Sequence, residues 1–316
     1  MSGIDLNRKD KHLRWATVRS ILELDSIKHK INGKKSRSHW STFEKILKFA
    51  TFFLKNFGFH RRGKKNALDL SLNEIDLFFD NLPEEFDGFS ILHLSDLHVD
   101  GLPEITDAIL KKVSDQEYDL CVITGDFRYE TRGMYKQIIE PLKKITLNIV
   151  SKNGILAVLG NHDTWRITEF AQELGVHFLI NESISIAKGK NQITVTGTDD
   201  PFKYFTDDQV EALEEPTESF KIALVHTSEL SKVAAERNYK LYLCGHTHGG
   251  QICLPGGIPL ITHQYEGRKY FRGIWHLNGM TGFTSQGCGV SGMPIRFFSR
   301  GEIVKINLRK RTPASI

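Results

Sequence analysis

The chain is poor in cysteine, and its few cysteines show no metal-binding spacing. Only 4 of its 316 residues are cysteines, and none forms a Cys-x-x-Cys pair. This spacing disfavours an all-thiolate zinc site. Cys121 and Cys244 lie inside apolar, strand-like runs, so we expect buried free thiols in a reducing compartment rather than disulfides.

Membrane-directing segments are also missing from the sequence. The charged start, with Arg8, Lys9 and Asp10, contains no apolar signal-peptide core. No run approaches the roughly 18 apolar residues of a membrane span, and no internal repeat or low-complexity stretch is present. We therefore expect a cytoplasmic protein, with any membrane contact peripheral and on the inner face.

The net charge of +4 conceals a strong asymmetry along the chain. Residues 1–66 carry 17 Lys and Arg against 5 Asp and Glu, whereas residues 67–316 carry 25 against 33. This split predicts a basic N-terminal arm over 1–66 and an acidic body over 67–316. A basic arm indicates an anionic partner surface, either a membrane or a nucleic acid.

Residues 40–65 of the arm have the pattern of a basic amphipathic helix. A capping box at Ser41–Glu44 precedes apolar residues at helical spacing, and the basic run 60–65 follows Gly58. Such a segment suits peripheral contact with a membrane. Packing on the catalytic body or on a second subunit is the alternative. We expect no specific nucleic acid, because no base-reading module is present.

After residue 68, five apolar runs each end in polar residues. The runs are Phe89–Leu94, Tyr118–Thr124, Ile155–Leu159, Lys221–Val225 and Tyr239–Cys244. The polar residues that follow them are Asp96, His98, Asp126, Asn161, His162, Asp163, His226, His246 and His248. Helical segments separate several of these runs, which indicates an α/β fold with its active site at the carboxyl ends of the strands.

These polar residues offer the ligands of a metal centre. Asp96 and His98 lie two residues apart, so both can turn towards one ion, and so can His248. Asp126 follows a glycine and can bridge two ions. Carboxylate, amide and imidazole ligands together suit Mn, Fe, Zn, Co or Ni. Two ions about 3.5–4 Å apart can orient a phosphate and neutralise its developing charge.

Two further residues have the chemistry of catalysis. His162 directly follows the ligand-type Asn161 and can protonate a leaving oxygen or hold a phosphoryl group as a cation. Asp163 beside it can orient that imidazole.

The ordered motifs Asp96-x-His98, Gly125-Asp126, Gly160-Asn161-His162-Asp163, His226 and Gly245-His246-x-His248 resemble the calcineurin-like metallophosphoesterase superfamily. The resemblance spans about Ser71 to Leu308. It implies a four-layer α/β/β/α sandwich, a catalytic His162 and two divalent ions, with Mn expected first and Fe, Zn, Co, Ni or Mg as options. It places one ion on Asp96, His98, Asp126 and His248, and the other on Asp126, Asn161, His226 and His246.

Two arginines are candidate substrate contacts. Arg128 follows Gly125-Asp126, where many family members have an acidic or amide-rich turn; it is either a phosphate contact or a surface residue. Arg296, in the glycine-rich C-terminal block, is a candidate anion contact.

The tail motifs favour a narrower branch of the family. Gly249-Gly250-Gln251, Leu254-Pro255, Gly287-Cys288-Gly289 and Pro294-Ile295-Arg296 resemble bacterial, membrane-associated members, including the chlamydial-type UDP-2,3-diacylglucosamine pyrophosphatase of lipid A synthesis. Together with the basic arm, this resemblance implies a phosphodiester or pyrophosphate hydrolase acting on a lipid-linked substrate. Loop 256–260 is either a contact for an acyl chain or a rigid turn.

Two other functions stay open at this point. One is a broad-specificity phosphodiesterase or phosphomonoesterase acting on soluble compounds. The other is a metal-binding scaffold without turnover, which the presence of His162 disfavours. The sequence leaves the oligomeric state open.

Overall fold

The computed structural model describes residues 3–31, 59–260 and 268–311, and the chain divides into two units, Met1–Lys65 and Asn66–Ile316. The first unit contains helix α1 (Gly3–Ile31), and helix α3 (Phe59–Leu68) begins in it. The amphipathic pattern predicted over residues 40–58 lies outside the described residues. The basic run 60–65, expected as a tail, is helical within α3. None of the helices in the described ranges is long and apolar enough to span a bilayer.

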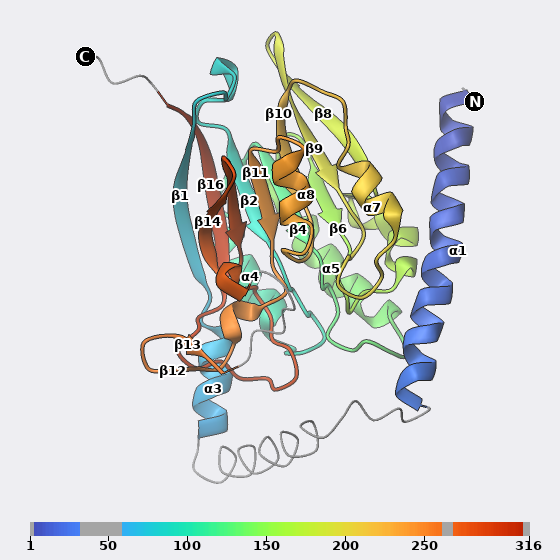
Figure 1. The fold of residues 1–316 in the computed structure, drawn as a ribbon. Coiled ribbons are helices and arrows are strands. Elements are labelled where there is room, and N and C mark those ends of the chain that lie inside the picture. Colours follow the sequence, from blue (N-terminus) through green and yellow to red (C-terminus); the bar gives the residue numbers. More distant parts are fainter. Residues whose placement is uncertain (1–2, 32–58, 261–267, 312–316) are drawn as a thin grey trace. The chain divides into compact units, whose positions relative to one another are not determined.

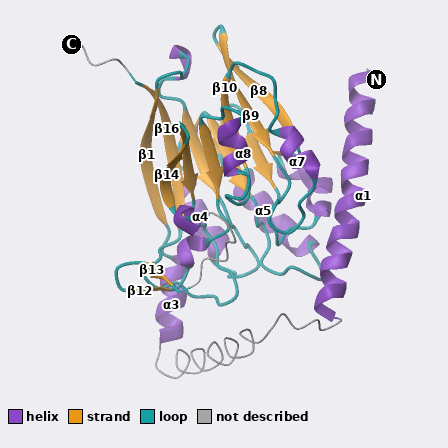
Figure 2. Cartoon of the chain, viewed as in Figure 1, coloured by secondary structure: helices purple, strands orange, loops and turns teal. Residues whose placement is uncertain are grey.

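The second unit contains two six-stranded sheets (Figures 1 and 2). The first sheet has the order β1-β16-β2-β4-β6-β7. Its strands are β1 (Ser71–Phe79), β16 (Glu302–Lys310), β2 (Ser90–Leu94), β4 (Leu120–Thr124), β6 (Ile155–Val158) and β7 (Val176–Phe178). All neighbours pair in parallel except β16 and β2, which are antiparallel.

The second sheet has the order β14-β15-β11-β10-β9-β8. Its strands are β14 (Gly273–Leu277), β15 (Met280–Thr284), β11 (Leu241–Cys244), β10 (Phe220–Leu224), β9 (Asn191–Gly197) and β8 (Glu182–Lys188). Its four central strands are parallel, and antiparallel hairpins close both edges. Two short pairs lie outside the sheets, β3 (Glu117–Tyr118) with β5 (Val150–Ser151) and β12 (Cys253–Leu254) with β13 (Ile258–Pro259).

The main hydrophobic core lies between the two sheets. One cluster of buried side chains joins Leu120 and Val122 of β4 to Ile222 and Leu224 of β10. Neighbouring residues such as Cys121 are also buried, although their side chains point to the opposite face of the strand. Both faces of the central strands are therefore covered, which explains why these strands are continuous apolar runs.

Helices cover the outer faces of the sheets (Figure 2). Between the strands of the first sheet lie α4 (Ile105–Val113), α5 (Ile139–Thr146) and α6 (Ala171–Leu174). Beside the second sheet, α7 (Asp207–Ala212) and α8 (Ser231–Glu236) border a second core cluster that includes Leu213, Ala234 and Tyr242. The layers are therefore helix, sheet, sheet and helix, which confirms the predicted α/β sandwich.

The structure adds elements that the sequence patterns did not predict. Strands β7 and β8, the β14–β15 hairpin and helices α7 and α8 are all short, so their periodicity is weak. The described part of the second unit also has five short 3-10 helices, at Glu84–Phe86, Lys136–Ile138, Trp165–Phe170, His248–Gly250 and Arg268–Tyr270. The four cysteines are free and buried, as predicted.

The fold brings the polar ends of the strands from both sheets together. The His226 ring nitrogen Nδ1 lies 2.8 Å from the carbonyl of Thr124, which ends β4 in the other sheet. The Gly245 amide donates to the His226 carbonyl, and the Asp96 amide donates to the Gly125 carbonyl. One edge of the sandwich therefore holds all five of the predicted motifs.

Candidate metal centre

Six of the seven predicted ligands, together with His162, form three overlapping groups of buried or half-buried side chains. The groups are Asp96–His98–His248, His98–Asp126–His162 and Asp126–His226–His246. In each group the ligand atoms lie within 4.8 Å of one another. The loops after β2, β4, β6, β10 and β11 supply these residues.

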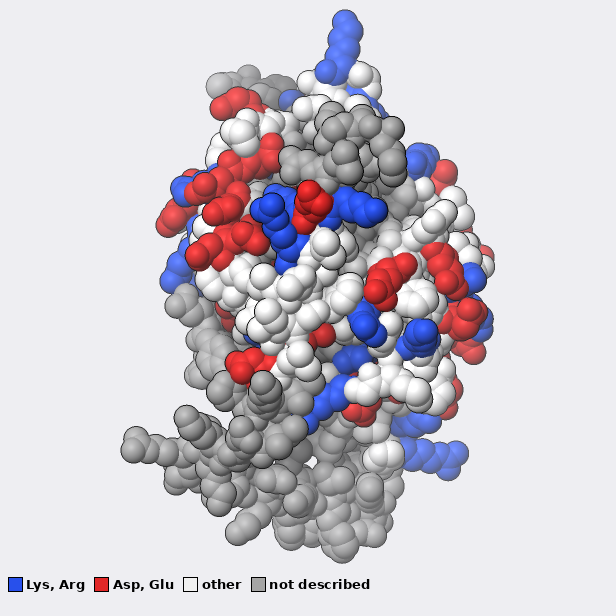
Figure 3. Space-filling model, turned by 90° about the vertical axis from the view of Figure 1, so that its right-hand side faces the viewer, with Lys and Arg blue, Asp and Glu red and all other residues white. Residues whose placement is uncertain are grey.

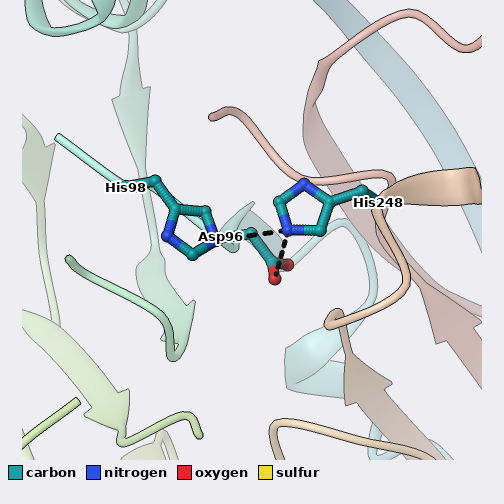
Figure 4. A group of neighbouring side chains, drawn as sticks. All are labelled: Asp96, His98 and His248. Carbon is teal, nitrogen blue, oxygen red and sulfur yellow. Dashed lines mark hydrogen bonds and ion pairs between the residues drawn. The ribbon is translucent and has the colours of Figure 1, made fainter. Parts of the chain in front are cut away.

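In the first group, three electron-rich atoms face each other (Figure 4). The Nε2 atoms of His98 and His248 are 3.2 Å apart, and His248 Nε2 lies 3.4 Å from Asp96 Oδ1. The two imidazole rings are stacked at 5.0 Å between centroids. Asp96 also accepts hydrogen bonds from Ser95 Oγ at 2.6 Å and from the His246 amide at 3.0 Å.

Asp126 lies between this group and the next. Its Oδ2 is 3.6 Å from His98 Nε2, 3.4 Å from His226 Nε2 and 4.0 Å from His162 Nε2. Its Oδ1 accepts from the His162 amide at 2.8 Å, which fixes the direction of the carboxylate. One oxygen of Asp126 therefore faces imidazoles of both halves of the site.

Asn161 lies beside the third group, and His226 and His246 of that group are close to each other. Asn161 Oδ1 lies 3.0 Å from His226 Nε2, and the rings of His226 and His246 are 5.1 Å apart.

The loops that present these residues have unusual backbone conformations. Five of the seven predicted ligands have positive φ: Asp96 (50°), His98 (40°), Asp126 (56°), His246 (72°) and His248 (52°). The left-handed region is unfavourable for residues with a Cβ, and such conformations cluster at functional sites. Hydrogen bonds from the Asp96 and His98 amides to the carbonyls of Gly125 and Asp126 hold the first turn in place.

Main-chain carbonyls orient three of the imidazoles. Nδ1 of His98 lies 2.7 Å from the Arg128 carbonyl, and Nδ1 of His162 lies 2.6 Å from the Tyr129 carbonyl. His226 has the equivalent contact with Thr124. A carbonyl can only accept, so each Nδ1 carries the proton and each Nε2 faces the site. Sequence motifs gave no signal for these carbonyls.

Burial sets the charge of the first group. Burial lowers the pKa of His98 to about 3 and also holds that of His248 well below its ordinary value. Both imidazoles are therefore neutral near pH 7, the form that binds metals. Burial raises the pKa of Asp96 to about 6. Burial would also raise the pKa of Asp126, but the charges of His226 and His162 lower it well below its usual range.

This set of donors fits divalent cations. Two neutral imidazole nitrogens and a carboxylate oxygen converge in a buried space, and a second carboxylate joins them to an amide oxygen and two more imidazoles. Such a cluster of buried acceptors is unfavourable unless a cation or protons lie between them. The residues present therefore suit a dinuclear divalent metal site.

Asp163 and Arg128 lie directly behind the ligand loops. The Asp163 carboxylate is buried and accepts from the amides of Gly160, Asp126 and Phe127 at 2.8–2.9 Å. Burial raises its pKa to about 7. The Arg128 Nε–H donates to the His162 carbonyl at 2.8 Å. Both residues thus hold the main chain around Asp126 and His162.

Arg296 is fully buried, and its guanidinium donates to main-chain carbonyls of segment 286–289 and of His248. This placement favours a role in holding the ligand loops over direct contact with a substrate.

The loop after β9 also borders the site, although the motifs did not include it. The Phe202 ring lies 4.5 Å from that of His246, and Lys203 Nζ lies 3.2 Å from the Asn161 carbonyl. The polar run Thr198–Asp200 at the end of β9 is the signal that could have located it.

Comparison with known proteins agrees with this geometry. The family model described as calcineurin-like phosphoesterase matches residues 89–250, which is just over half of the chain and spans every predicted ligand. The chain belongs to the calcineurin-like phosphoesterase family. It is therefore a metal-dependent phosphoester hydrolase.

Several bacterial and animal members of the family are similar to this chain. YkuE, an uncharacterised metallophosphoesterase of Bacillus subtilis, is 28% identical over 72% of this chain and 82% of its own length. The phosphodiesterase YaeI of Escherichia coli is 25% identical over 80% of this chain and 92% of its own. A transmembrane protein with a metallophosphoesterase domain from Danio rerio is 26% identical over 75% and 57%.

Proposed function

We propose that residues 67–316 form a catalytic domain that hydrolyses a phosphodiester or pyrophosphate bond with two divalent ions. Asp96, His98, Asp126 and His248 would hold one ion, and Asp126, Asn161, His226 and His246 the other. The position of Asp126 carries this proposal, because its Oδ2 lies within 3.6 Å of an imidazole from each half of the site. When bound, such ions supply Lewis acidity and neutralise charge on the phosphoryl oxygens.

His162 is the proposed general acid. Its side chain is 18% exposed, whereas that of Asp126 is 2% exposed, so His162 is open to a substrate. The Tyr129 carbonyl holds Nδ1, which leaves the Nε2–H of the imidazolium to protonate a leaving oxygen. We propose that Asp163 supports catalysis through the main-chain amides it binds, and that the terminal nitrogens of Arg128 contact the phosphate.

The substitution Asp126→Asn tests the shared ligand. We expect the variant to lose both ions, whereas the wild-type chain retains two. Elemental analysis of the purified protein with added Mn²⁺, together with turnover of an aryl phosphodiester, provides the measurement. Two ions retained by the folded variant would refute the bridging role, and absence of metal-dependent turnover in the wild type would refute the proposed chemistry.

A lipid-linked substrate such as UDP-2,3-diacylglucosamine is the finer proposal. The β12–β13 hairpin begins a few residues after His248 and exposes Leu254 (49%), Ile258 (61%) and Leu260 (58%). Exposed aliphatic side chains close along the chain to a metal ligand suit contact with an acyl chain.

Replacing Leu254, Ile258 and Leu260 together by Ser separates the two kinds of substrate. We expect kcat/KM for UDP-2,3-diacylglucosamine to fall at least about tenfold, from the loss of buried apolar contacts, with turnover of the aryl phosphodiester unchanged. Met134→Ser with Leu147→Ser, two exposed apolar residues outside the hairpin, is the matched control. An equal effect on both substrates would favour the broad-specificity alternative.

We also propose that the basic arm, residues 1–66, contacts an anionic membrane surface. In the described part of the arm, α3 presents exposed Arg61, Arg62 and Lys65. On the face drawn in Figure 3, the described acidic side chains gather mainly towards the upper left, and the described basic side chains lie in smaller groups. Charge reversal of these three residues to Glu should abolish co-sedimentation with vesicles containing anionic lipid. Unchanged binding would refute this role for α3.

A further inference from the structure

We propose that Arg296 is a positioning residue for the ion held by Asp96, His98 and His248, an inference that rests on the proposed metal centre. Arg296 lies in the segment before β16 and is 0% exposed. Burial lowers its pKa to about 10, so the guanidinium is still charged at neutral pH. A buried cation is costly unless its hydrogens have partners.

The partners of Arg296 are the carbonyls of two segments. Nε donates to Gly289 O at 3.1 Å, and Nη2 donates to Gln286 O and Gly289 O, both at 2.7 Å, with Gly287 O at 3.2 Å. Nη1 donates to His248 O at 3.1 Å. Nη2 also lies 3.3 Å from His248 Nδ1, the longest of these contacts. One planar fork therefore joins the His248 turn to segment 286–289.

Segment 286–289 in turn supports Asp96 and His98. The Cys288 amide donates to Ser95 O at 2.9 Å, and the Gly289 amide donates to Asp96 O at 2.7 Å. The approach is close: a Cβ added to Gly289 would lie 2.4 Å from Leu97 O and 2.8 Å from His98 Cβ. Arg296 thus connects the segments that carry all three residues of the first group.

The turns at Asp96 and His248 need this support because their backbone conformations are unfavourable. His248 and Asp96 both have positive φ, which is unfavourable for a residue with a Cβ. The Ser299 hydroxyl also donates to His248 O, at 3.0 Å. Within the described ranges, the hydrogen bonds of Arg296 do not reach Asp126, Asn161 or His226. Loss of Arg296 should therefore weaken one ion and spare the other.

The test measures ions per chain in the full-length variants Arg296→Lys and Arg296→Gln. Lysine keeps the charge but has three donors on one nitrogen in place of the planar five-donor fork of arginine. Arg300→Gln is the matched control, because Arg300 is exposed and pairs with Asp69 at 2.7 Å. We expect two Mn²⁺ per chain in the wild type and the control, and one in each Arg296 variant. Loss of support behind the ligands should raise the dissociation constant of the weakened ion about 10–100-fold.

A spectroscopic readout separates positioning from general destabilisation. Two adjacent Mn²⁺ ions give an exchange-coupled electron paramagnetic resonance signal, and the variants should show the signal of an isolated ion instead. If Arg296→Gln does not fold, Ser299→Ala, which removes only the hydroxyl that donates to His248 O, provides the milder comparison. Folded variants that keep two coupled ions with wild-type affinity would overturn the positioning role. Wild-type protein that binds two ions but shows no turnover would refute the proposed function alone. Wild-type protein that binds no ions would refute both the proposed function and the positioning role of Arg296.

Discussion

The case of His162 shows that the role of a residue depends on its position in the fold as well as on its residue type. An imidazole after an amide ligand is a candidate acid by chemistry alone, but the carbonyl of Tyr129 decides which nitrogen faces the site. Asp163, the adjacent acid in the sequence, instead receives hydrogen bonds from main-chain amides. Neighbours in sequence are therefore poor guides to the partners of a side chain in a loop.

Replacing His162 by Ala should separate catalysis from metal binding. We expect both ions to remain and kcat to fall by roughly 10²–10⁴-fold, the usual contribution of a general acid. His177→Ala is the control, because that imidazole is 39% exposed and pairs with Glu182. Turnover of the His162 variant within about threefold of wild type, measured at equal metal content, would contradict the role.

The buried His93 should make the stability of the fold sensitive to acid, independently of the metals. It is fully buried on β2, and burial lowers its pKa to about 3, while an unfolded histidine titrates near 6.5. The unfolded chain therefore takes up this proton first as the pH falls. The contribution of neutral His93 to the free energy of unfolding is therefore fully present above about pH 6.5, and it is lost as the pH falls towards 3.

The measurement is urea unfolding of the chelator-treated protein between pH 6 and pH 4. Relative to wild type, His93→Leu should remove about 1.4 kcal/mol per pH unit from the slope of unfolding free energy against pH. His276→Leu, at an exposed position of β14, is the control. Parallel slopes for wild type and the His93 variant would rule out this explanation.

At the scale of elements, the site depends on how closely the loops after the strands approach each other. Gly245 directly follows β11 and precedes His246, and a Cβ there would lie 1.9 Å from Ser95 Oγ and 2.3 Å from Asp96 Oδ2. The first and second sheets meet at this point. A glycine in the motif is therefore needed for close approach and not only for a turn.

Gly245→Ala should consequently disturb both packing and metal binding. We expect the free energy of unfolding to fall by about 1–3 kcal/mol, as for other overpacked sites, and the ion near Asp96 to be lost. Gly279→Ala is the contrasting variant: its φ is 81° but nothing lies within 4 Å of the added Cβ. That variant should lose stability from backbone strain and keep both ions, as judged by denaturant unfolding and elemental analysis.

At the scale of the whole molecule, the candidate metal centre links the two sheets. Its residues run from Asp96 to His248 and come from loops of both sheets. Ions that bind only the folded chain stabilise it by about 2.7 kcal/mol at a hundredfold excess over their dissociation constant. Metals should thus contribute to the stability of the whole catalytic unit.

Removal of the metals should therefore lower the melting temperature. For a unit of this size, we expect a decrease of roughly 5–10 °C on adding a chelator, reversed by Mn²⁺. Differential scanning calorimetry with and without EDTA gives the comparison, and the Asp126→Asn variant should not respond. Equal melting temperatures in a protein shown to bind two ions would contradict the linkage.

The sequence by itself determined the ligand types, their order and the class of chemistry, because a short motif at a strand end is local and metals demand particular donor atoms. It also determined the buried strands, whose apolar runs are continuous. The tertiary structure alone decided the left-handed turns at five of the predicted ligands, the carbonyls behind His98, His162 and His226, and the burial of Arg296. Those contacts join segments that are about 30 to 100 or more residues apart in the sequence, or they depend on how the two sheets pack. A local sequence pattern contains no information about either.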